Sequence, residues 1–164
     1  MATHAQREHA VRVMDFMHEH REQLAYPPGD ERTTRDNISW RLSEQHMETL
    51  LRRGGIWQGD CSEFGSYVLK CAGLWHWQEP GWTGSHLILL PRHYTDGRLA
   101  LPGALVIFGV GNGKHEAVVR TRDERHGNPI VASHGRPGFD LLPASEIAAA
   151  VGTGAIRYLS IAHL

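Results

Sequence analysis

Apolar side chains recur at helical spacing in three stretches of the first half of the chain, and each stretch predicts a helix. The first stretch is residues 5–24, and its apolar face consists of Ala10, Val13, Met14 and Met17. The second is residues 39–53, and its predicted face consists of Leu42, His46, Leu50 and Arg53. The third is residues 61–73, with a predicted buried stripe of Phe64, Val68, Cys71 and Ala72.

The second half of the chain changes to a β pattern. Residues 75–101 are rich in aromatic residues, histidine, proline and glycine, and we expect them to line a cleft as irregular structure. Within them, residues 87–90 fit a short helix and a strand equally well. A helix is expected over residues 144–151, and strands are expected over residues 105–108, 116–121, 130–133 and 156–161. Helices followed by an antiparallel sheet predict an α+β fold, and residues 1–164 are expected to form a single domain.

Composition and charge remove several classes of protein from consideration. The net charge of −1 argues against a nucleic-acid-binding surface, which is usually basic. No apolar stretch reaches the roughly 18 residues of a membrane span, and the charged N-terminus does not resemble a signal peptide. Two cysteines, Cys61 and Cys71, do not indicate a disulfide-stapled scaffold.

Cys61 occupies the position on the chain that best fits a reactive thiol. Asp60 is a plausible N-cap for the third helix, and Glu63 falls at the N3 position of a capping box. The unpaired N–H groups and the dipole at a helix N-terminus favour a thiolate. Cys71 lies within the apolar stripe of the same helix and is expected to be structural.

A cysteine nucleophile needs a base and a group that orients the base. His115 opens a predicted strand after a glycine-rich turn, and His134 ends the next strand. Adjacent antiparallel strands would bring both side chains to the start of the cysteine helix. The chain has 12 histidines, so any one of them also fits a surface or capping role.

Four segments resemble the NlpC-type cell-wall peptidases. Residues 60–64 resemble the Asp-Cys-Ser-Gly-Phe signature of that family, and residues 102–108 resemble its Pro-Gly-Asp-Leu-Val-hydrophobic-Phe strand. Residues 114–118 are similar to its His-Val-Gly-Ile strand, and residues 131–135 to the strand of its third polar residue. The N-terminal peptidase domains of actinobacteriophage endolysins carry similar Asp-Cys-Ser, Gly-Lys-His and Ser-His-Gly elements, followed by Leu-Leu-Pro as at residues 141–143. The resemblance begins near Tyr26, so the helix within residues 1–25 is an addition to the pattern.

The resemblance implies a papain-like fold and an acyl-thioester mechanism. Cys61 would be the nucleophile, His115 its base, and His134 the residue that orients His115, with Ser133 as the alternative. Tyr26 would border the site, as the upstream tyrosine of the family does; packing at a helix end is an equal interpretation of that residue. The predicted substrate- and oxyanion-binding set consists of Tyr26, Asp60, Ser62 and Ser133.

Three positions depart from the family pattern. Glu63 replaces glycine, or the serine of the phage proteins, and Ala104 replaces aspartate. Glu116 replaces a small or apolar residue directly after the base. A carboxyl group there would shift the pKa of the base or alter the choice of substrate.

The expected function is therefore cleavage of amide bonds in the stem peptides of bacterial peptidoglycan. The resemblance alone implies that the cleaved bond lies near meso-diaminopimelate. Because the chain shows no signal peptide, we expect a phage lysin or virion-associated lysin, which would be made in the cytoplasm and reach the wall by release or injection. A partner that supplies wall targeting is a further expectation. No cofactor, no metal and no nucleic-acid partner is expected. The alternatives are an amidase or acyltransferase of the same fold, or a non-catalytic domain that binds wall peptides or a partner protein. A zinc site built from Cys61, His115 and His134 is chemically conceivable but less favoured.

Overall fold

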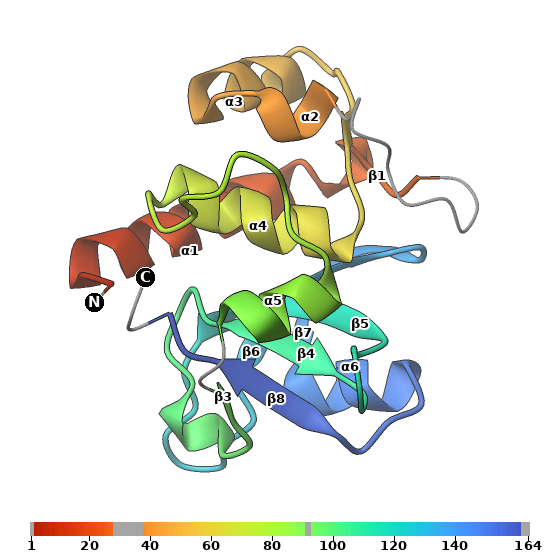
Figure 1. Cartoon of the computed structure of the whole chain (residues 1–164). Helices are drawn as coiled ribbons and strands as arrows, with labels where there is room; N and C mark the ends of the chain where they lie inside the picture. The colour runs from red at the N-terminus through yellow and green to blue at the C-terminus, as the bar shows by residue number, and fades with distance from the viewer. Residues whose placement is uncertain (1, 28–37, 91–92, 162–164) are drawn as a thin grey trace.

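The computed structural model describes residues 2–27, 38–90 and 93–161, and Figure 1 gives their arrangement. The helices are α1 (His4–Glu19), α2 (Ile38–Arg41), α3 (Glu44–Arg52), α4 (Cys61–Cys71), α5 (Thr83–Leu89) and α6 (Ala144–Ala150), with 3-10 turns η1 (Arg21–Gln23) and η2 (Gly97–Leu99). The strands are β1 (Leu24–Ala25), β2 (Trp57–Gln58), β3 (His93–Tyr94), β4 (Leu105–Phe108), β5 (His115–Thr121), β6 (Ile130–Gly135), β7 (Gly138–Pro143) and β8 (Ile156–Leu159).

The strands β3 to β8 form a six-stranded antiparallel sheet in the order β3-β8-β4-β5-β6-β7. Helices α1 and α4 lie over one face of this sheet, and α6 lies on the other (Figure 1). The predicted α+β architecture is confirmed. Strand β7 was not expected, because its sequence, with glycine at its start and proline at its end, lacks a clean strand pattern.

Strand alternation assigns each residue of the sheet to one of the two faces. Leu105, Ile107 and Val118 belong to the core under α4, and Val106 and Ala117 to the core under α6. The strands β4 and β5 therefore face an apolar layer on both sides. The consequence for the site is that neighbouring residues of β5 and β6 project in opposite directions.

Helix α4 is the central helix of the molecule. It packs against α1 on one side and against β5 and β6 on the other. Every residue from Cys61 to Leu69 is buried, because this helix has neighbours all round. The predicted start at Cys61 is confirmed, and Cys71 ends the helix half-buried.

The expected second helix is divided in two. Ser43 caps α3 by accepting a hydrogen bond from the N–H of His46, so Leu42 lies outside that helix. Met47 and Leu51 are the buried residues of α3, and His46 is exposed. The predicted face of Leu42, His46, Leu50 and Arg53 is therefore wrong, since it assumed one continuous helix through the cap.

The first helix ends at Glu19, before the predicted end near residue 24. Its four predicted apolar residues are all buried. They belong to the same core as α4 and the sheet, so the N-terminal helix is an integral part of the packing. Residues 87–90, which fitted a helix or a strand, lie mostly within the helix α5.

Candidate active site

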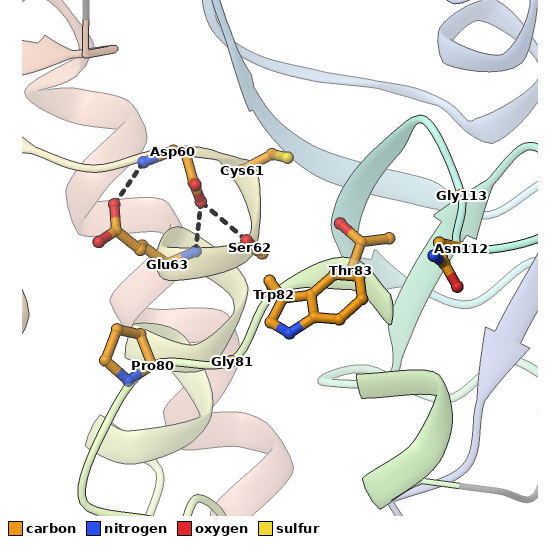
Figure 2. A pocket seen from close by; sticks show the side chains of 10 residues that line it. All are labelled: Asp60, Cys61, Ser62, Glu63, Pro80, Gly81, Trp82, Thr83, Asn112 and Gly113. Atoms are coloured by element: carbon orange, nitrogen blue, oxygen red, sulfur yellow. Dashed lines mark hydrogen bonds between the residues drawn. The ribbon is translucent and has the colours of Figure 1, made fainter. Parts of the chain in front are cut away.

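The first turn of α4 is held by the predicted capping box. Asp60 accepts a 2.8 Å hydrogen bond from the N–H of Glu63, and the Glu63 carboxylate accepts one of 2.8 Å from the N–H of Asp60. Ser62 Oγ donates to the same Asp60 carboxylate over 2.8 Å (Figure 2). These bonds fix the main chain around Cys61, so Asp60 and Ser62 have a positioning role in addition to any contact with substrate.

A cavity of about 380 Å³ opens beside Cys61. Figure 2 shows the first turn of α4 on one side, with Trp82 and Thr83 next to it and Asn112 farther across. Pro80 and Gly81 continue the wall from the segment before α5. The expectation that residues 75–101 line a cleft is confirmed for this segment. The lining by Asn112 and Gly113 was not expected, because this turn meets α4 only in the folded chain.

Two hydrogen-bond donors contact Sγ of Cys61. They are the hydroxyl of Tyr26 and the main-chain N–H of Glu116, and both lower the pKa of the thiol. Burial has the opposite and larger effect, followed by the carboxylates of Glu116 and Asp60, and together they raise the pKa of Cys61 to about 12. The thiol is therefore protonated at neutral pH.

Tyr26 reaches Cys61 because two short strands pair in parallel. Leu24 and Ala25 of β1 pair with β2, and the N–H of Gly59 donates to Ala25 O over 3.2 Å. This pairing places the residue after β1 beside the residues that precede α4. Tyr26 therefore lies beside Cys61, and its role at the border of a site stays a prediction.

His115 is oriented by Ser133. Its Nε2 lies 2.8 Å from Ser133 Oγ, and its ring stacks on Phe108 at 6.0 Å between centroids. Burial, and next the nearby His134, lower the pKa of His115 to about 4, although Asp60 raises it. The imidazole is consequently neutral at pH 7. No hydrogen bond between this ring and the Cys61 thiol is seen among the described residues. Alternation along β5 places His115 on the face of Phe108 and Ala117, opposite to the face that α4 covers, so the structure does not bring the predicted base into contact with the thiol.

His134 does not hydrogen-bond to His115, which departs from the expectation drawn from the resemblance. Its Nε2 donates to Gly59 O over 3.0 Å, and its ring is fully buried among Tyr26, Trp57 and Phe64. Adjacent residues of a strand face opposite ways, so Ser133 and His134 cannot both meet His115. His134 instead supports the main chain at the start of α4. Burial lowers the pKa of His134, so it acts as a neutral donor.

The described residues contain no group of three histidine, cysteine or acidic side chains arranged to hold a metal ion. Within the same residues, no helix has both the length and the apolar character to cross a membrane.

Comparisons with family models, with curated proteins and with solved structures found no significant match to this chain.

Proposed function

We propose that this protein is a cysteine peptidase of the papain-like, NlpC type that hydrolyses amide bonds in the stem peptides of bacterial peptidoglycan, as a phage lysin or virion-associated lysin does. The observation that carries the proposal is the setting of Cys61. The residue occupies the first position of a capped helix, lines a cavity of about 380 Å³ and contacts the strand that begins with His115. The choice of peptidoglycan comes from the sequence resemblance of residues 60–64, 102–108, 114–118 and 131–135.

The chemistry that fits this setting is acyl transfer through a thioester. Sγ of Cys61 attacks the carbonyl carbon of the scissile amide while its proton passes to His115. The C–N bond then breaks, and His115 returns the proton to the leaving amine. Water next attacks the thioester, gives a proton to His115, and the C–S bond breaks to restore the thiol.

The protonation states of Cys61 and His115 determine when the proton moves during the attack. Burial raises the pKa of Cys61 and lowers the pKa of His115, so the resting pair is a thiol and a neutral imidazole. Proton transfer to His115 therefore accompanies the attack. Ser133 holds the imidazole through Nε2, and the ring would have to turn toward Sγ when substrate binds for Nδ1 to take the thiol proton.

The developing oxyanion needs donors near the start of α4. The main-chain N–H of Cys61, at the first position of that helix, is the natural donor, and one such donor lowers the barrier by about 3 kcal/mol. Tyr26 donates its hydroxyl to Sγ in the free protein and is next to the same region. We propose that it contacts the substrate once Sγ is acylated.

Digestion of purified actinobacterial sacculi tests the proposal. Wild type should release muropeptides with newly formed amine and carboxyl ends, identified by mass spectrometry, and Cys61→Ala should release none. Cys71→Ala is the matched control, because Cys71 is the other free cysteine and ends the same helix away from the cavity. Equal release by wild type and Cys61→Ala would refute the mechanism. Binding without release by either protein would favour a domain that only recognises wall peptides.

A further inference from the structure

A buried hydrogen-bond network lies beside Cys61 that the mechanism above does not use. Glu116 Oε2 is 2.6 Å from His86 Nδ1, and His86 Nε2 is 2.9 Å from Ser66 Oγ. All three residues have 0% of their surface exposed. Of these three residues, the sequence singled out only Glu116, as a departure from the family pattern. The hydrogen bonds join three separate segments of the chain, so the sequence pattern did not predict them.

The network joins three elements, and two of them, α4 and α5, contribute residues to the cavity wall. Ser66 belongs to α4, His86 to α5 and Glu116 to β5. Ser66 Oγ also accepts a 3.0 Å hydrogen bond from the N–H of Gly81, in the cavity wall. Gly65 makes this approach possible, because a side-chain carbon there would clash with Oε1 of Glu116.

Serine, histidine and glutamate in this order resemble a hydrolase triad, but burial excludes that role. A nucleophile must meet its substrate, and Ser66 is completely enclosed. Its hydroxyl also already contacts Ser62 O over 2.9 Å, in addition to His86 and Gly81. The network must act through a neighbouring group.

That neighbouring group is Cys61. The main-chain N–H of Glu116 contacts Sγ, and the carboxylate of Glu116 opposes ionisation of the thiol. The pairing of β5 with β6 begins at Ala117 and Ser133, so Glu116 lies just beyond the end of that ladder. Oε1 of Glu116 has no hydrogen-bond partner among the described residues. The partner of the carboxylate there is the imidazole of His86, whose Nδ1 lies 2.6 Å from Oε2.

We propose that His86 and Glu116 are a positioning pair for Cys61: they hold β5 against α4, bring the N–H of Glu116 to Sγ, and fix the carboxylate of Glu116 beside the thiol. The proposal rests on the proposed function in taking Cys61 as the nucleophile. The polar and charged groups that face Cys61 are Tyr26, Asp60 and Glu116. Those that face Glu116 are His86, Asp60 and Cys61.

The test is the pH dependence of Cys61 alkylation in Glu116→Gln, which keeps the shape of the side chain and removes its charge. Iodoacetamide modification is followed by peptide mass spectrometry, so that Cys61 and Cys71 are counted separately. We expect the midpoint of the profile to fall by about one pH unit, which makes alkylation at a given pH below the midpoint about tenfold faster. Asp15→Asn is the control, because its carboxylate pairs with Arg120 and does not face Cys61.

A midpoint equal to that of wild type, in a folded Glu116→Gln protein, would overturn the proposal. Sacculus digestion by the same preparations separates the two proposals. A shifted midpoint without muropeptide release by wild type would leave the positioning pair standing and refute the peptidase. Release by wild type with an unshifted midpoint would do the reverse.

A second measurement uses only proteins that keep Glu116, in case Glu116→Gln does not fold. Because coupling between two charges is reciprocal, ionisation of Cys61 must also act on the Glu116 carboxyl group. The NMR signal of the side-chain carboxyl carbon of Glu116 should move with pH at the midpoint of Cys61 alkylation in wild type, and that step should be absent in Cys61→Ser. Identical pH profiles of this signal in the two proteins would overturn the proposal.

Discussion

Cys61 is buried and His115 is partly buried, and at the scale of single residues this determines how they can react. Burial penalises the charged form of each group, which raises the pKa of the thiol to about 12 and lowers that of the imidazole to about 4. A preformed thiolate–imidazolium pair is therefore disfavoured in the free protein. The proposed chemistry needs only the neutral imidazole, which is available over a wide range of pH.

This gives a prediction for the pH dependence of activity. Muropeptide release should stay nearly constant from pH 7 down to about pH 5 and then fall through pH 4, because protonation of His115 removes the base. The measurement is the initial rate of release at substrate concentrations well below KM, which reports kcat/KM and therefore the free protein. A fall with its midpoint near 6.5, the ordinary value for histidine, would contradict the burial of the base.

Ser133 and His134 have different roles, and their alanine variants should differ accordingly. Ser133→Ala removes the hydrogen bond that orients His115, a contribution of about 1 kcal/mol, so kcat should fall about fivefold with little change in Tm. His134→Ala removes a buried ring and the donor to Gly59 O, so the free energy of unfolding should fall by about 3 kcal/mol or more. Urea unfolding and sacculus digestion of both variants check the distinction. A stable His134→Ala protein with a lower kcat than Ser133→Ala would support the role that the resemblance assigned to His134.

At the scale of elements, local sequence signals predicted the structure well where they were complete. The capping box at Asp60 and Glu63 needs only a few consecutive residues, and it predicted the start of α4 at Cys61. The division at Ser43 was missed, because the apolar spacing on both sides of it also fits one longer helix. The pairing of β1 with β2 and the strand β7 depend on contacts between segments that apolar periodicity does not reveal.

The same limit explains which part of the site was predicted. Cys61 and His115 lie in motifs that can be recognised along the chain, and Ser133 was already named as the alternative to His134. His86 was not named, since 30 residues separate it from Glu116 and only the packing of α5 against the sheet brings them together. Alternation along the strands could have favoured Ser133 over His134 as the partner of His115. Ser133 faces the same side of the sheet as Ala117, its partner on β5, and so does His115, two residues before Ala117.

The caps of two helices provide a matched pair of variants at this scale. Asp60→Ala and Ser43→Ala each remove an N-cap, so each should lower the free energy of unfolding by about 1 kcal/mol. Only Asp60→Ala should also change Cys61, because the Asp60 carboxylate raises the pKa of that thiol. Urea unfolding measures the first effect, and the rate of alkylation at pH 8 measures the second. Unchanged alkylation in Asp60→Ala would show that the cap and the thiol are electrostatically independent.

At the scale of the whole molecule, α1 stabilises the scaffold although it lies outside the resemblance. Met14 and Met17 are completely buried in the core that includes Phe64 and Val68 of α4. Arg120 of β5 holds α1 against the sheet through two hydrogen bonds to Asp15, of 2.6 and 3.0 Å. The N-terminal helix thus packs against α4, the helix that begins with Cys61.

Two variants of α1 should therefore differ strongly in stability. Met14→Ala creates a cavity in the core and should cost 2–5 kcal/mol, about the range for large-to-small core substitutions. Asp15→Asn breaks a half-exposed ion pair and should cost about 0.5 kcal/mol. The measurement is the free energy of unfolding in urea. Equal losses in the two variants would mean that α1 is held by its ion pair and not by its apolar face.

The central claim is that peptide-bond cleavage passes through the sulfur of Cys61, and partial alkylation of the wild-type protein tests it most directly. Samples are modified with iodoacetamide to different extents, and each is assayed for muropeptide release and mapped by mass spectrometry. We expect the fraction of activity lost to equal the fraction of Cys61 that is modified, whether or not Cys71 is modified as well. Activity that persists when Cys61 is fully modified would contradict it.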